Sequence, residues 1–311
     1  MDERTTYPAG PLDPGGRPER DRATEAFVAH RSLLFTVAYE MLGSAADAED
    51  AVQETWLRWA GVDLGAVRDP RAYLVRIATR QALDRLRTLA RRKETYVGPW
   101  LPEPLLTAPD VAEDVELADS VSTAMLLVLE TLRPTERAVF VLREVFGAEY
   151  EEIAEAVDKS PATVRQIAHR ARAHVAARRP HGTVSAAEAG RALRAFQQAV
   201  ETGDLRDLLD LLAPDVVLIG DGGGIRPAAT QPLVGADSVA GTLSQGLPLL
   251  VGTAAVEPAQ INGCPALIIR IGPEIEAVVT LRIDDGLIGA LYVVRNPQKL
   301  SRVTRETAVT R

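Results

Sequence analysis

Residues 132–179 constrain the fold of this chain more than any other stretch, because their apolar spacing predicts three helices that end in a helix-turn-helix. The predicted helices cover residues 134–145, 150–157 and 161–178. Ser160 suits the N-cap of the last helix, and Pro161 suits its first position, where a proline loses no hydrogen bond. An apolar face for burial is formed by Val164, Ile167, Ala168, Ala171 and Val175.

The charges of this segment indicate what the last helix does. Residues 159–179 carry six basic side chains and no carboxylate, whereas the preceding helix carries Glu151, Glu152 and Glu155. A basic amphipathic helix after a tight turn is what docking into the major groove of DNA requires. The alternative is an ordinary helical hairpin with a solvated basic face. The Ser-Pro start, the apolar spacing and the charge asymmetry together favour DNA binding.

The composition limits the class of protein. A chain of 311 residues suggests two or three domains, and its net charge of −8 argues against a protein that coats nucleic acid without selectivity. The single cysteine, Cys264, excludes an internal disulfide and a cysteine-rich metal site, and we expect no cofactor. We expect no signal peptide in residues 1–23, which are predicted to form a disordered arm. No apolar run is long enough to span a bilayer, so we expect a soluble cytoplasmic protein with no membrane partner.

An acidic helix and a basic helix are predicted in the first third of the chain. After a helix over residues 24–42, the helix that follows Ser44 carries four acids near its start, and the helix that follows Asp69 carries arginines on its exposed faces. Surfaces of opposite sign suggest two different partners. Trp56, Trp59 and Tyr73 are spaced for burial, and we predict that they pack in the core and do not stack on bases.

Three segments together resemble the extracytoplasmic-function (ECF) sigma factors of bacterial RNA polymerase. They are DAEDAVQETWLRW at 47–59, DPRAYLVRIATRQALDRLR at 69–87, and the helix-turn-helix at 132–179, in the order of that family. The resemblance implies that the first segment binds the clamp of the largest subunit of core RNA polymerase. It implies that the second recognises the minus-ten promoter element and helps to unpair it, and that the third reads the minus-thirty-five element.

The resemblance also assigns candidate residues to each role. For polymerase binding they are Asp47, Asp50, Gln53 and Glu54. For the minus-ten element they are Arg76, Thr79, Arg80, Asp84 and Arg87, because an unpaired strand needs cations for its phosphates and pockets for its bases. For the minus-thirty-five element they are Thr163, Arg165, Gln166, His169 and Arg170.

The rest of the chain resembles one subgroup of that family, which carries a C-terminal domain like the SnoaL polyketide cyclases. Three short motifs support this resemblance: WLPEP at 100–104, DGGG at 221–224 and NPQKL at 296–300. The subgroup usually has a lysine after DGGG, and here Ile225 and then Arg226 follow. Two helices after residue 185 and strands at 216–219, 265–271, 275–283 and 287–294 agree with a curled α+β cone, with Asp285-Gly286 as a hairpin turn.

We therefore expect a multi-domain protein: two all-α sigma domains, the second a helix-turn-helix, and an α+β SnoaL-like cone. The expected segments are the arm at 1–23, sigma domain 2 at 24–93, a Pro-rich linker at 94–116, sigma domain 4 at 117–180 with a first helix at 117–132, a linker at 181–187, the cone at 188–300 and a tail at 301–311.

The cone is not expected to be an enzyme. All four histidines precede it, so acid–base chemistry would fall on carboxylates such as Asp215 or Asp221, and Asp221 beside three glycines fits a turn. Residues 188–300 hold thirteen acids and eight bases, a net charge of −5, so a tethered cone could cover the basic DNA-reading helices. The resemblance implies regulation in cis, partly in place of a separate anti-sigma factor.

We also expect the three motifs to meet at one interdomain contact. Its candidate residues are Trp100, Leu101, Pro102, Asp221, Gly222, Gly223, Asn296 and Pro297. Two alternatives stay open at this point. One is a one-component helix-turn-helix regulator with a ligand-sensing cone, and the other is a SnoaL-like enzyme fused to a DNA-binding module.

Overall fold

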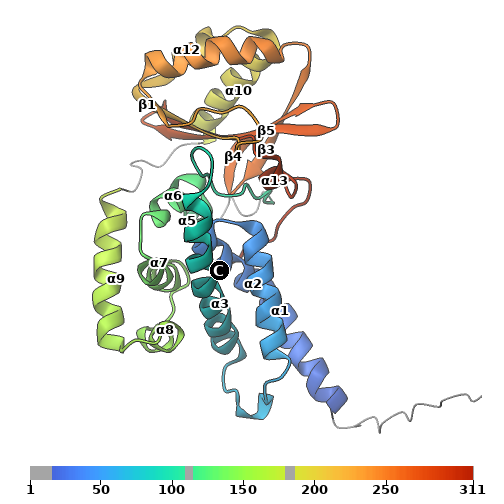
Figure 1. The fold of residues 1–311 in the computed structure, drawn as a ribbon, viewed down its shortest axis with the longest axis vertical. Coiled ribbons are helices and arrows are strands. Elements are labelled where there is room, and N and C mark those ends of the chain that lie inside the picture. Colours follow the sequence, from blue (N-terminus) through green and yellow to red (C-terminus); the bar gives the residue numbers. More distant parts are fainter. Residues whose placement is uncertain (1–15, 109–114, 179–185, 311) are drawn as a thin grey trace, which may run out of the picture.

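The computed structural model describes residues 16–108, 115–178 and 186–310. Two units of helices lie side by side, and an α+β domain sits across one end of them (Figure 1). The fold class expected from the sequence is thus confirmed. Among the described residues, no helix has both the length and the apolar character that a membrane span needs.

The first helical unit consists of α1 (Gly16–Leu42), α2 (Ala45–Trp59), the short 3-10 turn η1 (Leu64–Ala66) and α3 (Pro70–Glu94). Trp59 is fully buried and its indole nitrogen donates to the carbonyl of Ala23 at 2.8 Å, while Trp56 packs on Phe27 at 5.1 Å between ring centroids. The predicted core role of both tryptophans is confirmed. Because α1 begins at Gly16, the prediction of a disordered arm was wrong for residues 16–23, and residues 1–15 lie outside the described residues.

The second helical unit consists of α5 (Val115–Val121), α6 (Thr123–Glu130), α7 (Pro134–Phe140), a π-helical turn η2 (Val141–Val145), α8 (Tyr150–Val157) and α9 (Pro161–Ala176). The single helix predicted for residues 117–132 is instead two helices, since the hydroxyl of Ser122 caps a new start by accepting from the backbone N–H of Met125. The predicted caps of α9 are confirmed: Ser160 accepts from the N–H of Thr163, and Pro161 is the first helical residue.

The two helical units share one hydrophobic core. It runs from Ala23 in α1 to Val175 in α9 and includes the predicted apolar face of α9. Helix α3 of the first unit lies against α7 and α8 of the second (Figure 1). A shared core means that the two units are packed together in this structure and are not separate bodies on a string.

The C-terminal domain is built on a six-stranded sheet with the strand order β2-β1-β6-β5-β4-β3. The strands are β1 (Leu212–Asp221), β2 (Leu233–Val234), β3 (Ala254–Ile261), β4 (Cys264–Ile271), β5 (Glu274–Asp284) and β6 (Leu287–Val294). β1 runs parallel to β6, and every other pair is antiparallel. The four predicted strands are confirmed. β2 and β3 were missed because both lie at sheet edges, and β3 contains Pro258, which makes its pattern weak.

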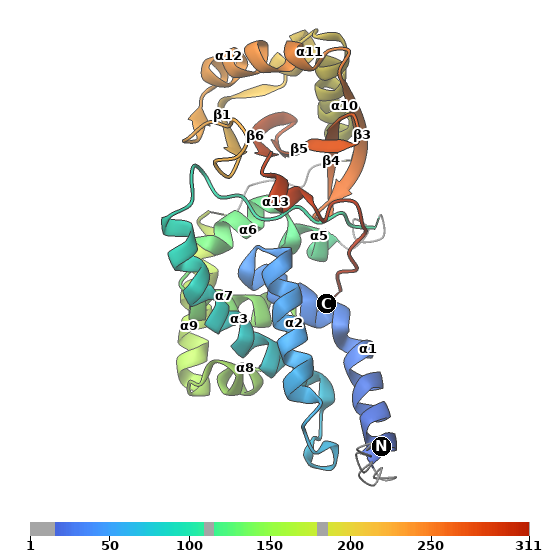
Figure 2. The same cartoon turned by 45° about the vertical axis from the view of Figure 1, so that its right-hand side comes forward.

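One face of the sheet is covered by helices and the other faces the helical units. α10 (Ala186–Thr202), α11 (Arg206–Leu209), α12 (Ala236–Gly246) and the 3-10 turn η3 (Leu247–Leu250) lie on the outer side (Figure 2). The inner face carries a second apolar cluster, in which Ile268, Val278 and Tyr292 of the sheet pack with Leu101 of the linker. The linker therefore runs between the sheet and the helical units. Helix α13 (Pro297–Leu300) follows β6, and residues 301–310 return to α1 (Figure 2).

Candidate nucleic-acid interface and interdomain junction

The recognition face of α9 is open. Gln166, His169 and Arg170 are exposed, whereas Arg165 forms an ion pair with Glu151 at 2.9 Å. The hydroxyl of Thr163 lies 2.8 Å from that of Ser160, at the first turn of the helix. The N-terminal half of α9 thus presents an amide, an imidazole and a guanidinium toward solvent, the groups that can contact base edges and phosphates.

The corresponding face of α3 is covered by α8. Glu155 of α8 forms an ion pair with Arg76 at 2.6 Å, and its backbone carbonyl accepts from Arg80 at 2.7 Å. Thr79 lies one turn from Arg76, is fully buried, and its hydroxyl has no hydrogen-bond partner within the described parts of the chain. Asp84 and Arg87 form an exposed ion pair at 2.8 Å. Two of the five minus-ten candidates, Arg76 and Arg80, therefore bond across the contact between the two helical units.

The buried hydroxyl of Thr79 is informative. A polar group that is buried without a partner costs about 1–3 kcal/mol, so packing alone does not favour a threonine at this position. The sequence carries no signal for the α3–α8 contact, because this contact joins residues of separate helical units.

The acidic residues of α2 are held by one arginine of α3. Arg85 lies 3.3 Å from Asp47, 3.2 Å from Asp50 and 2.9 Å from Glu54. Asp47 is only 8% exposed and also accepts from the hydroxyl of Ser44, so in this structure it orders the start of α2. Asp50 and Glu54 keep about half of their side chains exposed, and Gln53 is exposed. The outward acidic face thus comprises the last three of the four predicted residues.

A buried ion pair joins two of the three sequence motifs. The Lys299 ammonium of α13 lies 2.7 Å from Oδ2 of Asp221 at the end of β1, and both side chains are almost fully buried. The third motif completes the contact, since Leu101 donates its N–H to the same carboxylate oxygen at 2.9 Å and its carbonyl accepts from Lys299 at 2.5 Å. Burial lowers the pKa of Lys299 to about 8, while the attraction of Asp221 opposes that shift.

Aromatic side chains of the linker enclose this ion pair. The ammonium of Lys299 lies 3.3 Å from the ring centroid of Trp100, and the hydroxyl of Tyr96 donates to Oδ1 of Asp221 at 2.5 Å. Burial, together with the hydrogen bond to Asp221, raises the pKa of Tyr96. Asn296 in turn donates from its side-chain amide to the hydroxyl of Tyr96 at 2.8 Å. WLPEP, DGGG and NPQKL therefore converge on one carboxylate. Asp221 also makes the predicted turn contact, since its Oδ1 accepts from the N–H of Gly223 at 3.1 Å.

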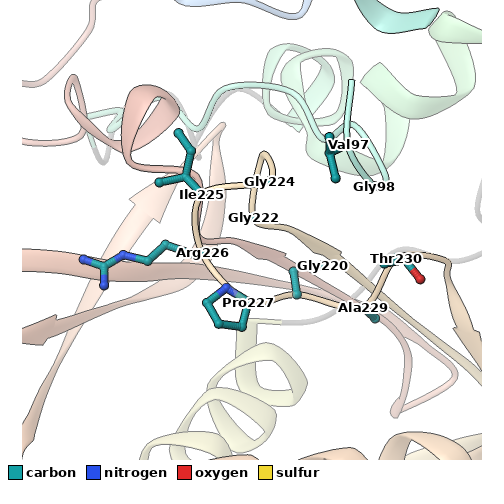
Figure 3. Close-up of a pocket in the computed structure, with 11 residues that line it drawn as sticks. Val97, Gly98, Gly220, Gly222, Gly224, Ile225, Arg226, Pro227, Ala229 and Thr230 are labelled. Carbon is teal, nitrogen blue, oxygen red and sulfur yellow. The ribbon is translucent and has the colours of Figure 1, made fainter. Parts of the chain in front are cut away.

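The glycines of DGGG allow this close approach. A Cβ on Gly222 would lie 2.0 Å from the carbonyl oxygen of Arg226, and one on Gly223 would lie 2.3 Å from the side-chain amide of Asn296. Figure 3 shows the loop facing Val97 and Gly98 of the linker across a cavity of about 310 Å³. Arg226 pairs with Glu274 and leaves the carboxylate of Asp221 to Lys299, so the cation beside Asp221 comes from NPQKL.

The two prolines that were predicted to lie at the interdomain contact differ in burial. Pro102 is buried within the WLPEP segment, whereas Pro297 is exposed and begins α13. Asn296 caps that helix by accepting from the N–H of Gln298 at 3.0 Å. Pro297 thus directs the chain at the junction and does not itself fill the contact.

Glu103 of WLPEP attaches the linker to the first helical unit. Its carboxylate accepts from the backbone N–H groups of Ala45 and Ala46 at 2.8 and 3.1 Å, at the N-terminus of α2, and from the hydroxyl of Ser44. A carboxylate at this end of a helix satisfies unpaired donors and interacts favourably with the helix dipole. Burial raises the pKa of Glu103, and these hydrogen bonds oppose that rise. Sequence reasoning missed Glu103, although it lies inside a motif that had been recognised.

Asn262 is the second residue that sequence reasoning missed. It occupies the β3–β4 turn with φ 54°, and its side-chain amide donates to the hydroxyl of Tyr39 at 2.6 Å and to the carbonyl of Val121 at 2.8 Å. Its side-chain oxygen accepts from the N–H of Leu105 at 2.8 Å. One side chain thus joins α1, α5, the linker and the sheet. The Asn262-Gly263 pair is a strong hairpin signal that could have located the turn, but not its partners.

A buried glutamate also joins the two helical units. Glu40 of α1 accepts from the hydroxyl of Ser120 in α5 at 2.8 Å, and its backbone carbonyl accepts from the guanidinium of Arg137 in α7 at 2.8 Å. Burial raises the pKa of Glu40 to about 8, with the hydrogen bond from Ser120 and the charge of Arg137 opposing the rise. No sequence pattern pointed to this contact.

Comparisons with known proteins agree with this architecture. Residues 26–92 match the model of Sigma-70 region 2, and residues 122–175 match that of Sigma-70 region 4. The chain is 36% identical to the ECF RNA polymerase sigma factor SigJ of Mycobacterium tuberculosis, over 88% of this chain and 92% of that protein. It is 32% identical to a probable ECF sigma factor, SigI, of the same species, over 93% of this chain and 98% of the relative. The crystal structure of M. tuberculosis SigJ superposes with a TM-score of 0.71 at 34% identity, covering 90% of this chain and 98% of that one.

The fold and the site therefore define a promoter-recognition factor of bacterial transcription initiation. The chain belongs to the ECF RNA polymerase sigma factor family, and the SigJ structure shares its C-terminal extension. Sigma factors are initiation factors and carry out no catalytic step, so the expectation that the cone is not an enzyme agrees with the family.

Proposed function

We propose that this chain binds the clamp of core RNA polymerase through Asp50, Gln53 and Glu54 of α2 and works in the cytoplasm, where the polymerase acts. The exposure of these three side chains supports the proposal. Asp47 supports the same surface from inside, because it orders the first turn of α2 and shares Arg85 with Asp50 and Glu54.

We further propose that promoter DNA is contacted by α9 at the minus-thirty-five element and by α3 at the minus-ten element. Thr163, Arg165, Gln166, His169 and Arg170 would serve the first contact, and Arg76, Thr79, Arg80, Asp84 and Arg87 the second. The two faces differ in availability, since α9 is open whereas Glu155 occupies Arg76 and Arg80. The structure would thus be a resting form that must open before the minus-ten strand is captured.

In this proposal the C-terminal domain regulates the opening in cis. It does so without covering the basic DNA-reading helices, which is the mechanism that its negative charge suggested. The C-terminal domain, the acidic cone of the sequence analysis, contacts the linker and one end of the helical units. It lies away from the α3–α8 contact (Figures 1 and 2). Covering of α3 comes from α8 of the neighbouring helical unit. The cone acts by fixing the linker through Asp221 and Lys299 and by bonding to both helical units through Asn262.

The observation that carries the proposal is that the face of α9 is open while Glu155 closes the face of α3. The test is capture of the purified chain by core polymerase, followed by transcription in vitro from genomic promoter fragments. We expect a stable complex that initiates at specific sites, and loss of core binding in an Asp50→Arg/Glu54→Arg variant. Failure of the wild-type chain to bind core polymerase, or to direct initiation from any template, would refute the proposed function.

A further inference from the structure

The last described residues of the chain, 301–310, return to the first helical unit and end on α1 (Figure 2). The N–H of Thr307 donates to the carbonyl of Leu106 in the linker at 2.8 Å, and the N–H of Thr310 donates to the hydroxyl of Thr36 in α1 at 3.0 Å. Thr36 is itself fully buried. The segment is therefore bonded to two separate parts of the chain and is not a loose tail.

Two valines anchor the segment at its ends. Val303 is 1% exposed and belongs to the apolar cluster between sheet and linker, whereas Val309 is 4% exposed and belongs to the core of the helical units. A side chain buried in each of two cores makes the segment a bridge between the C-terminal domain and α1.

The bridge runs beside the proposed polymerase-binding helix. A groove of about 450 Å³ separates residues 301–308 from Arg31 and Phe35 of α1 and from Ala45 and Glu49 of α2. Glu49 lies one residue before Asp50 and one turn before Gln53. The segment thus lies at the edge of the acidic face and leaves its exposed side chains uncovered.

Contacts of the C-terminal domain with the second helical unit are of a different kind. They centre on the β3–β4 turn, where Asn262 donates to the carbonyl of Val121 and Gly263 approaches the Cα of Ala118 so closely that a Cβ would lie 2.6 Å away. Three contacts attach the C-terminal domain and the linker to the first unit. They are the hydrogen bond from Asn262 to Tyr39, the cap that Glu103 forms on α2, and the burial of Val309 in the helical core. The C-terminal domain is thus attached to the first unit through several separate segments. Its attachment to the second includes the β3–β4 turn and the side chains of Ala124 and Leu127 in α6, which pack on the sheet–linker cluster.

We propose that residues 301–310 form a strap that fastens the cone and the linker to the first helical unit, so that these three parts move as one body and the second helical unit is the part that swings away. In this arrangement the cone stays beside α2 when the chain opens on a promoter. The swing rests on the proposed function, but the strap itself can be tested without polymerase.

The experiment uses the full chain with pairs of spin labels on cysteines placed at exposed sites, in a Cys264→Ala background. Val28 in α1, Leu249 in the cone and Ala177 at the end of α9 are exposed. In the free chain, Val309→Asp should broaden the distance distribution between labels at 28 and 249, because it places a charge in an apolar core. Thr304→Asp, which adds the same charge at an exposed position of the segment, should leave it narrow. An equally narrow distribution in Val309→Asp would overturn the strap.

The second stage repeats the distances in the complex with core polymerase and promoter DNA. We expect the 28–249 distance to stay unchanged and the 177–249 distance to lengthen. Lengthening of the 28–249 distance, alone or with the other, would overturn the proposal that the cone stays with the first unit. If the chain binds polymerase but neither distance changes, the swing is wrong and the strap stands on the free-chain result. If no complex forms, it is the proposed function that fails.

Discussion

Glu155 of α8 and Arg76 of α3 form an ion pair with a 2.6 Å separation across the contact between the two helical units, and the backbone carbonyl of Glu155 also accepts from Arg80. Arg76 and Arg80, whose charges suit the phosphates of an unpaired strand, are thus both bound to one residue of the second helical unit. In the proposed function, Glu155 would compete with the minus-ten strand for these two arginines, so the strength of this pair would set how easily α3 becomes available.

Replacing Glu155 by glutamine should therefore favour minus-ten binding. Because the side chain of Glu155 is 67% exposed and that of Arg76 is 29% exposed, loss of the pair is worth at most about 1 kcal/mol. The affinity of the free chain for a single-stranded minus-ten oligonucleotide should then rise by up to about fivefold. Fluorescence anisotropy measures the change. Glu144→Gln, which removes the pair with Arg172 outside this contact, is the matched control, and an equal gain in both variants would contradict the role of Glu155.

Asp221→Asn should strongly destabilise the junction. The substitution leaves Lys299 charged and buried without its partner, a change that costs about 3–5 kcal/mol. Denaturant unfolding of the full chain measures the loss. Asp215→Asn, an exposed aspartate of the same strand, should change stability by no more than about 0.5 kcal/mol. Equal stability of the two variants would show that the Asp221–Lys299 pair does not hold the linker.

Asn262→Gly separates the side-chain bonds of the β3–β4 turn from its backbone conformation. Glycine accepts the positive φ of this position, so the variant loses only the bonds to Tyr39, Val121 and Leu105, at a cost of about 2–4 kcal/mol. Asp285→Gly makes the same change at the β5–β6 hairpin turn, where φ is 51°, and should have little effect. Comparable losses of unfolding free energy in the two variants would contradict the junction role of Asn262.

The contact between α1 and the second helical unit should weaken as the pH rises. The pKa of Glu40 is raised to about 8 in the folded chain from an ordinary value near 4.5, so the folded state binds the proton more tightly than the unfolded state does. The stability from this group is present at pH 5 and is lost as the pH rises toward 8. The melting temperature of wild type relative to Glu40→Gln should fall over that window. A constant difference from pH 5 to 8 would contradict the assignment.

The open face of α9 predicts that the free chain binds minus-thirty-five duplex DNA before α3 is released. Arg170→Ala should weaken that binding by about 1–3 kcal/mol if the guanidinium contacts a base, while Arg178→Ala, at the far end of the segment, should have a smaller effect. Binding measured at fixed salt tests this, since phosphate contacts depend on ionic strength. Absence of duplex binding by the free chain would show that α9 is blocked in solution.

Sequence by itself determined the features that depend on residues within one or two turns of each other. The Ser160 cap, the buried face of α9 and the core positions of Trp56 and Trp59 follow from local spacing, and all are present. The meeting of WLPEP, DGGG and NPQKL was inferred from a family resemblance and not from their chemistry. The key cation Lys299 and the cap Glu103 were therefore overlooked inside motifs that had been named.

Tertiary structure alone decided which surfaces are available. Arg76 and Glu155 are 79 residues apart in the chain, and Asn262 and Tyr39 are 223 apart. No periodicity links such positions, because helix and strand patterns report only which side of an element is apolar and not which element covers it. Three features arise only when separate segments share one core, so only the packed chain shows them. They are the covering of α3 by α8, the bonds by which Asn262 joins α1, α5, the linker and the sheet, and the return of Val309 to the helical core.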